Sequence, residues 1–253
     1  MQDIITEYVL WKVNYYFLSV IGVSFVAGIF LILLILKRKP ALRRELWTKY
    51  IVYLAIVGVS SILLLSPWRI WFLVAISGIG LVELFYSRRG KPDTNAFAYG
   101  YLLYCLLCSG MLIFSSMTNY ELFWLYALIV LFDGFSQLTG LLFGKHKLAP
   151  RISPAKTVEG FAGGFIAVFV ALLIRGINSD AVDWLSQLAA TSVVCVTALI
   201  GDLLASKWKR MAGVKDFSNL LPAHGGILDR FDSFIGASGI LGLTAGVIEF
   251  FMK

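Results

Sequence analysis

The stretch Leu122–Phe143, LFWLYALIVLFDGFSQLTGLLF, contains 22 residues and a single charged one, Asp133. A helix of about 20 apolar residues, rising about 1.5 Å per residue, crosses the hydrocarbon core of a bilayer. The stretch therefore predicts a transmembrane helix. A carboxylate inside an apolar span is costly, and such a residue is a functional candidate by default, with a cation, a metal or a water-filled cavity as its expected partner.

The composition of the whole chain agrees with a membrane protein. Hydrophobic residues make up 59% of the 253 residues and charged residues only 15%, whereas ordinary soluble domains carry about 25% charged residues. The net charge is +7, but the basic residues fall in short loops between apolar runs, as in loops beside anionic lipid headgroups. No basic stripe is interleaved with stacking aromatics, so we expect membrane lipids and no nucleic acid as partners.

Eight apolar segments could span a membrane, and the predicted fold class is all-α, a polytopic integral membrane bundle of about eight transmembrane helices. Glycines at 236, 239, 242 and 246 in the last segment favour close helix–helix contact. We divide the chain into N-terminal transmembrane helices, 1–120, and a C-terminal region, 121–253, that carries the polar motifs. The predicted spans are Tyr15–Leu36, Ile51–Leu65, Trp68–Tyr86, Phe97–Met117, Leu122–Phe143, Phe161–Ile177, Trp184–Ala205 and Ile227–Met252.

The positive charge lies on one side of this arrangement. Of the 22 Lys and Arg residues, 18 fall in or beside the loops that follow the first, third, fifth and seventh spans. The other four are Lys12, Arg69, Arg175 and Lys253. Because cytoplasmic loops carry an excess of Lys and Arg, we expect those four loops to face the cytoplasm and both termini to lie on the opposite side.

Two of the cytoplasmic loops hold most of the residues that could do chemistry. The first is Gly144–Gly160, GKHKLAPRISPAKTVEG, in which Ser153, Lys156 and Thr157 stand beside the start of the sixth span. The N-terminus of a helix attracts phosphate, because its first N–H groups lack partners within the helix. The alternative interpretation is a solvated basic loop that ends in a helix cap.

The second polar segment is Gly201–Ser233. Asp202 and Ser206 are four residues apart on one helix face, and Asp229 and Asp232 are three apart at the next helix start. Carboxylates among basic residues fit Mg²⁺ that is shared with substrate phosphates; the alternative is a set of surface salt bridges at helix ends. His224 either touches substrate or only hydrogen-bonds within its turn. The other polar or turn-forming residues singled out here are Lys209, Arg210, Lys215, Asp216, Gly225, Gly226 and Arg230.

The tract Ser206–Asp232, SKWKRMAGVKDFSNLLPAHGGILDRFD, resembles the signature of the phosphatidate cytidylyltransferases, which are also called CDP-diacylglycerol synthases. Upstream, Ser153–Gly160, SPAKTVEG, resembles a second motif of that family. The resemblance covers the chain from Asp133 to its end. Four positions depart from the family pattern: Trp208 stands for an aliphatic residue or Phe, Ser136-Gln137 stand for Ala-Tyr, and Val158 stands for a common Trp.

The resemblance implies a reaction and its partners. CMP passes from CTP to phosphatidic acid, which gives CDP-diacylglycerol and pyrophosphate, in the inner membrane of a bacterial type of cell with the site facing the cytoplasm. It also implies Mg²⁺, a second cation such as K⁺, and a homodimer. By position, the catalytic residues are Asp202, Asp229, Lys209, Arg210, Lys215 and Asp216, and the metal ligands are Asp202, Asp229 and Asp232. The substrate-binding residues are Asp133, Ser153, Lys156, Thr157, Ser206, His224, Gly225, Gly226 and Arg230.

Other functions remain open from the sequence. The departures at Ser136-Gln137 and Val158 leave open, as the alternative, a cytidylyltransferase or a lipid kinase that acts on a different lipid or isoprenoid phosphate. A kinase releases CDP, whereas a cytidylyltransferase releases pyrophosphate. A transporter predicts polar residues at the membrane midplane and related halves, and only Asp133 approaches the midplane. A non-catalytic paralogue predicts loss of the aspartates, which are all present.

Overall fold

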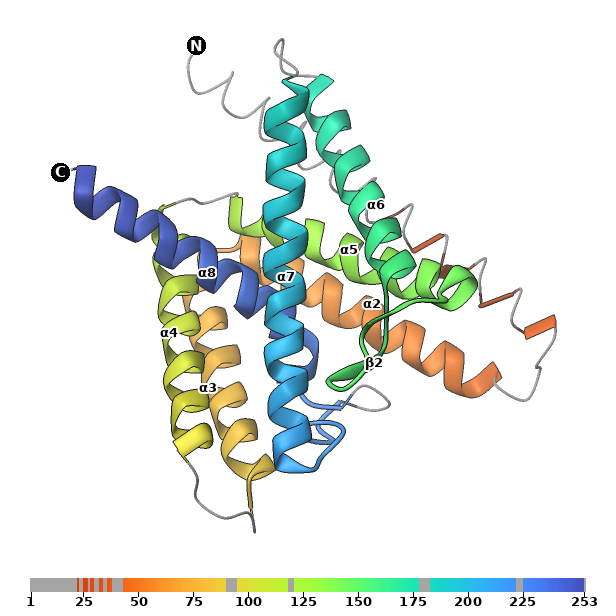
Figure 1. Ribbon diagram of the computed structural model, residues 1–253, viewed down its shortest axis with the longest axis horizontal. Coiled ribbons are helices and arrows are strands. Elements are labelled where there is room, and N and C mark those ends of the chain that lie inside the picture. Colours follow the sequence, from red (N-terminus) through yellow and green to blue (C-terminus); the bar gives the residue numbers. More distant parts are fainter. Residues whose placement is uncertain are drawn as a thin grey trace. The chain divides into compact units, whose positions relative to one another are not determined.

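The computed structural model describes residues 43–89, 95–117, 121–177, 183–221 and 225–252, together with scattered positions between 22 and 37. Seven helices and one short hairpin make up these ranges (Figure 1). The predicted first span, Tyr15–Leu36, lies mostly outside them. The elements are α2 Arg43–Leu65, α3 Arg69–Ser87, α4 Asn95–Met117, α5 Glu121–Phe143, β1 Lys147–Ala149, β2 Ser153–Thr157, α6 Val158–Ile177, α7 Trp184–Ala212 and α8 Leu228–Met252.

The all-α prediction is confirmed for the seven described helices, with one addition. The sequence analysis treated Gly144–Gly160 as a loop, whereas β1 and β2 pair there as a two-stranded sheet. The backbone N–H of Val158 donates to the carbonyl of His146 at 2.9 Å, just where β2 passes into α6. A strand of three residues is too short for alternation to reveal it, which explains the omission.

Five of the described helices are long and apolar enough to cross a membrane, namely α2, α3, α4, α5 and α7. In α6 the apolar stretch is shorter, Val158–Ile174. Large apolar side chains such as Trp71, Phe85 and Leu102 stand exposed on these helices, and contiguous apolar surface of that kind requires a nonaqueous partner. The protein is therefore an integral membrane helical protein, while the count of eight spans remains a prediction.

Two helices extend beyond their predicted spans. The span predicted at Ile51–Leu65 looked short, but α2 begins at Arg43. Similarly, α7 continues past Ala205 to Ala212. In both cases the added turns contain Lys and Arg, which are good helix formers although they cannot lie in hydrocarbon. At the start of α2 and at the end of α7, the helix therefore continues beyond the apolar segment that can lie in the membrane.

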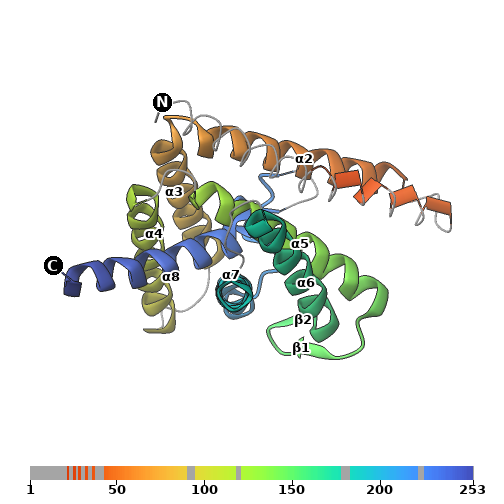
Figure 2. The same cartoon turned by 90° about the horizontal axis from the view of Figure 1, so that it is seen from above.

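The chain forms two compact units, Met1–Leu42 with Ala127–Leu148 and Pro154–Cys195, and Arg43–Tyr126 with Ala149–Ser153 and Val196–Lys253. In the second unit α4 packs on α3 and on α8, and α3 contacts α2 and α8 (Figures 1 and 2). Glycines permit these close approaches: a Cβ on Gly239 would lie 2.5 Å from the carbonyl oxygen of Leu107. The predicted role of the α8 glycines is thus confirmed at this position.

The first unit joins α6 to α5. Phe132 of α5 meets the ring of Phe161 edge to face, with centroids 5.6 Å apart, and the hydroxyl of Thr139 donates to the carbonyl of Gly160 at 3.3 Å. Thr157 caps α6, because its Oγ1 accepts the backbone N–H of Gly160 at 3.1 Å. This is the side-chain cap expected of a threonine just before a helix.

Candidate functional site

The C-terminal half of α7 presents polar residues at helical spacing. The hydroxyl of Ser206 donates to Oδ1 of Asp202 at 3.2 Å, so the predicted shared face of these two residues is confirmed. Because α7 runs to Ala212, Lys209 and Arg210 are also helical. The guanidinium Nε of Arg210 donates to the carbonyl of Ile152 at 3.1 Å, in the turn between the two short strands.

Asp229, in the first turn of α8, is buried and bonded through both carboxylate oxygens. Its side chain is 1% exposed and pairs with the ammonium of Lys209 at 2.6 Å through Oδ1. The backbone N–H groups of Phe217 and Gly226 donate to Oδ2 at 2.8 and 2.9 Å. A buried charge is tolerated when it is paired and hydrogen-bonded, so Asp229 closes the loop 213–227 onto the helix that follows it.

Backbone conformation and lack of space explain why positions 225 and 226 are glycines. Gly225 adopts φ +79, a conformation that other residues avoid, and a Cβ there would lie 2.9 Å from Oδ2 of Asp229. The N–H of Gly226 is already bonded to Asp229. Substrate contact by Gly225, Gly226 or the exposed Asp216 remains a prediction, but the Gly226 N–H is not free to bind a phosphate.

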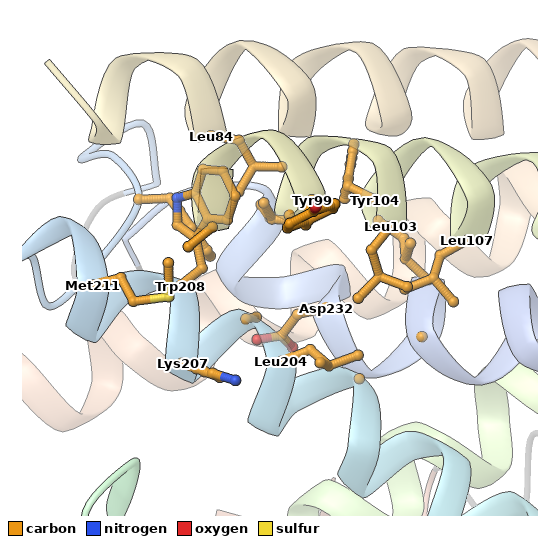
Figure 3. Close-up of a pocket in the computed structure, with 18 residues that line it drawn as sticks. Leu84, Tyr99, Leu103, Tyr104, Leu107, Leu204, Lys207, Trp208, Met211 and Asp232 are labelled. Atoms are coloured by element: carbon orange, nitrogen blue, oxygen red, sulfur yellow. The ribbon is translucent and has the colours of Figure 1, made fainter. Parts of the chain in front are cut away.

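A pocket of about 360 Å³ opens between α3, α4, α7 and α8 in the second unit. Its wall is mostly apolar, with Leu103, Leu107, Leu204 and Met211 among its side chains (Figure 3). Asp232 and Lys207 also line it, and both lie on the side of Leu204. One pocket therefore offers hydrocarbon contact and two opposite charges.

Trp208 forms a fixed part of that wall. Its indole N–H donates to Oγ of Ser87 at 3.0 Å, and its ring meets Phe97 and Tyr101 edge to face at 5.2 and 4.9 Å. The side chain is 6% exposed. A buried indole that has both a hydrogen bond and aromatic neighbours keeps one orientation, so the width of the pocket is set at this position.

One polar residue of this region, Glu83 in α3, was not predicted from the sequence. It is 3% exposed and accepts hydrogen bonds from the N–H groups of Ile227 and Leu228 and from the hydroxyl of Ser218. The rule that drew attention to Asp133, a carboxylate within an apolar span, applied equally to Glu83 in the predicted span Trp68–Tyr86.

Of the predicted residues in α5 and β2, one caps a helix and the others are half-buried. Thr157 is buried as the cap of α6, and Lys156 beside it is half-buried. Asp133 is also half-buried, within α5. Ser153 begins β2 and is assigned to the second unit. These positions are compatible with the predicted substrate contacts and do not test them.

Glu159 organises the start of the hairpin. It accepts the backbone N–H groups of Lys145 and His146, and a ring nitrogen of His146 lies 2.6 Å from its Oε1. The hydrogen bond from its own backbone N–H contributes most and the His146 ring next, and together they lower the pKa of Glu159 from 4.5 to about 2. The carboxylate is thus charged at all ordinary pH values.

A model of the cytidylyltransferase family matches residues 4–245. The chain belongs to the cytidylyltransferase family. Among its relatives, the phosphatidate cytidylyltransferase of Staphylococcus aureus strain COL is 35% identical over 181 residues, 67% of this chain and 68% of the relative. That of Staphylococcus epidermidis is 34% identical over 215 residues, 77% and 81% of the two chains, and that of Staphylococcus haemolyticus is 44% identical over 115 residues, 44% of each.

The carboxylates of this cytidylyltransferase fit Mg²⁺ only if water and substrate phosphate supply the remaining ligands. Within the described ranges no three His, Cys, Asp or Glu side chains gather closely enough to hold a metal. Asp229 is already paired with Lys209. Asp202 follows Gly201, whose Cβ would lie 2.7 Å from the backbone carbonyl of Asp232. One or two carboxylates with water and phosphate oxygens are what Mg²⁺ usually takes. The approach of Gly201 to the backbone of Asp232 is compatible with Asp202 and Asp232 as such ligands, and metal binding by these residues remains a prediction.

Three further predictions for this cytidylyltransferase stay predictions. His224 lies outside the described residues. Lys215 and Arg230 are exposed, as cations that meet a substrate from solution must be. The division of the chain at residue 120 likewise remains a prediction about function, while the packing units take α2, α3 and α4 together with α8.

Proposed function

We propose that the protein transfers CMP from CTP to phosphatidic acid, giving CDP-diacylglycerol and pyrophosphate. The family supports a cytidylyl transfer, and the relatives are named for phosphatidate as the acceptor. The observation that carries the proposal is the pocket in Figure 3, where Asp232 and Lys207 share a wall with apolar side chains. A lipid phosphate needs this combination, because its chain is apolar and its headgroup is charged.

The reaction requires the protein to position the two substrates, and it needs no side-chain nucleophile because the lipid phosphate attacks. An ionised phosphate oxygen of the lipid attacks the α-phosphorus of CTP, a new P–O bond forms, and the bond to the β-phosphate breaks to release pyrophosphate. When bound, Mg²⁺ would neutralise the polyphosphate charge. Asp202 and Asp232 would hold it, while Lys215, Arg210 and Arg230 would attract CTP electrostatically. A second cation such as K⁺ and a homodimer belong to the same proposal.

The apolar part of the pocket would accept the hydrocarbon chain of the acceptor. Each buried CH₂ group contributes about 0.8 kcal/mol, so a chain that lies along Leu103, Leu107 and Leu204 binds without any polar contact. Orientation completes the proposal: the signature loop faces the cytoplasm of a bacterial type of cell, where CTP is available, and both termini lie on the other side of the inner membrane.

The test uses purified protein in detergent micelles with Mg²⁺, labelled CTP and dioleoyl phosphatidic acid. We expect pyrophosphate release, a labelled CDP-diacylglycerol product, and loss of both on chelation. Asp232→Asn should abolish turnover, and Glu121→Gln, the same kind of change at an exposed carboxylate of α5, should not. Release of CDP would identify a lipid kinase. Pyrophosphate release only with an isoprenoid phosphate or another lipid phosphate would change the acceptor, and no reaction with any acceptor would indicate a non-catalytic paralogue.

A further inference from the structure

Glu83 lies on the buried face of α3. Six residues of this helix are buried, and their spacing of three, four, three, one and three residues places them on one stripe. They are Leu73, Ile76, Gly80, Glu83, Leu84 and Ser87. A carboxylate on such a stripe has no access to water, so it must find donors within the protein.

Glu83 has three hydrogen-bond donors, two in the segment between α7 and α8 and one at the first residue of α8. The N–H of Ile227 donates to Oε1 at 3.0 Å and the N–H of Leu228 to Oε2 at 2.7 Å. The hydroxyl of Ser218 also donates to Oε1, at 2.5 Å. The contacts link positions 135 to 145 residues apart in the chain. The same carboxylate therefore binds an interior residue of the loop 213–227 and the end of that loop at α8.

These bonds replace the cap that a helix normally receives from its own sequence. The first N–H groups of a helix have no partner within it, and a residue just before the helix usually supplies one. At α8 that partner comes from α3. Asp229 adds the second half of the arrangement, since it binds the N–H groups of Phe217 and Gly226. Two carboxylates thus fix four backbone N–H groups around the loop.

The carboxylate of Glu83 also occupies space that only a glycine at position 226 leaves open. A Cβ on Gly226 would lie 2.6 Å from Oε1 of Glu83, so a side chain at 226 would displace the carboxylate. One turn further along α3, Ser87 accepts the indole N–H of Trp208. The last turns of α3 therefore contact both the start of α8 and the end of α7.

We infer that Glu83 is a positioning residue for cytidylyl transfer: through the backbone of Ile227 and Leu228 it sets where α8 begins, and so where Asp229 and Asp232 stand. This inference rests on the proposed function for its kinetic consequence but not for its structural one. It also gives α3, one of the predicted N-terminal helices, a role in the site. The N–H groups at the start of α8 are committed to carboxylates, so they do not form a phosphate cradle.

The experiment compares Glu83→Gln and Glu83→Leu with the exposed control Glu121→Gln. Hydrogen exchange followed by mass spectrometry reports the loop directly, in a peptide that covers residues 214–230. We expect exchange in this peptide to rise by roughly tenfold or more in Glu83→Leu, the change that corresponds to losing a hydrogen bond to a charged group. Glu83→Gln keeps one acceptor oxygen and should give a smaller rise.

Kinetics separate positioning from general stability. Glu83→Gln should lower kcat and raise the Mg²⁺ concentration for half-maximal rate, whereas KM for the lipid should change little, because the apolar pocket wall is untouched. Ser218→Ala removes one donor and leaves the capping of α8 in place, so it should shift the Mg²⁺ requirement in the same direction by less. If Glu83→Leu does not fold, Glu83→Gln and Ser218→Ala still decide the question.

The outcomes distinguish this inference from the proposed function. Unchanged exchange in residues 214–230 in the Glu83 variants would overturn the inference, whether or not the wild type is active. A loss of kcat with an unchanged Mg²⁺ requirement and unchanged loop exchange would do the same. If the wild type shows no transfer from CTP but the Glu83 variants exchange faster, the proposed function fails and the positioning of α8 by Glu83 stands.

Discussion

The Lys209–Asp229 pair is buried, with side chains 12% and 1% exposed and 2.6 Å between the charged atoms. Removing one partner of a buried pair leaves an uncompensated charge, which costs about 3–5 kcal/mol. We therefore expect Lys209→Met to lower the thermal unfolding midpoint in detergent strongly. Lys147→Met, at an exposed lysine of β1, is the control and should stay within about 0.5 kcal/mol of the wild type. An unchanged midpoint in Lys209→Met would show that the pair does not stabilise the fold.

The depressed pKa of Glu159 gives the hairpin a defined pH dependence. Its folded pKa is about 2, below the ordinary value of 4.5, so its contribution to stability is complete above pH 4.5 and is lost as the pH falls from about 4.5 to about 2. We expect the amides of Lys145 and His146 to be more protected from exchange in the wild type than in Glu159→Gln at pH 6, and this difference to shrink as the pH falls from about 4.5 towards about 2. A difference as large at pH 2 as at pH 6 would contradict the assignment.

Residue-scale inference from the sequence worked where partners are local. The shared face of Asp202 and Ser206 follows from a four-residue spacing, and the structure confirms it. The pairing of Asp229 with Lys209 spans 20 residues, and that of Glu83 with Leu228 spans 145. Spacing along a helix carries no information about such contacts, so the sequence could suggest that these residues are polar and functional but not which partners satisfy them.

At the scale of elements, the crossing of α7 and α8 depends on two glycines. A Cβ on Gly201 would lie 2.9 Å from Cα of Gly236 and 2.7 Å from the carbonyl of Asp232. Gly236→Ala should therefore separate the helices, with a loss of about 1–3 kcal/mol and of activity, because Asp202 and Asp232 move apart. Gly78→Ala is the control, since no atom lies within 4 Å of its Cβ position and alanine favours a helix. Full activity in Gly236→Ala would show that the two carboxylates need not be close.

Trp208 lines the pocket, so its size should affect which lipid phosphates the protein accepts. Trp208→Leu opens space beside Phe97 and Tyr101, so it should shift the preference among lipid phosphates towards bulkier chains, by about tenfold in the ratio of kcat/KM values. Trp71→Leu, the same change at an exposed tryptophan of α3 that does not line the pocket, is the control and should leave the preference nearly unaltered. An unchanged chain preference in Trp208→Leu would place the hydrocarbon elsewhere.

Element boundaries were predictable where a polar residue stops an apolar run. The predicted span Leu122–Phe143 and the helix Glu121–Phe143 differ by one residue, and Trp184 begins both the predicted and the observed seventh helix. The prediction ended that span at Ala205 because charge begins there, but charge ends the hydrocarbon-compatible segment and not the helix. The hairpin was not predicted because β2 has only five residues and contains Pro154. So short a segment shows no clear alternation of apolar and polar residues.

At the scale of the whole molecule, topology depends most on α6. Its apolar stretch Val158–Ile174 is shorter than those of the five long helices, yet 20 helical residues extend about 30 Å, the thickness of the hydrocarbon core. If α6 spans, the exposed Lys147 before it and the exposed Ser186 after it lie on opposite sides. The uneven distribution of Lys and Arg predicts that Lys147 is cytoplasmic.

Cysteine labelling decides this point. Lys147→Cys and Ser186→Cys are made separately in a background in which Cys105, Cys108 and Cys195 are replaced by alanine, and intact cells are treated with a membrane-impermeant maleimide. We expect Ser186→Cys to react at once and Lys147→Cys only after the membrane is opened. Equal reactivity in intact cells would mean that α6 does not cross. The chain would then have an odd number of crossings if the other predicted spans hold, and its termini would lie on opposite sides of the membrane.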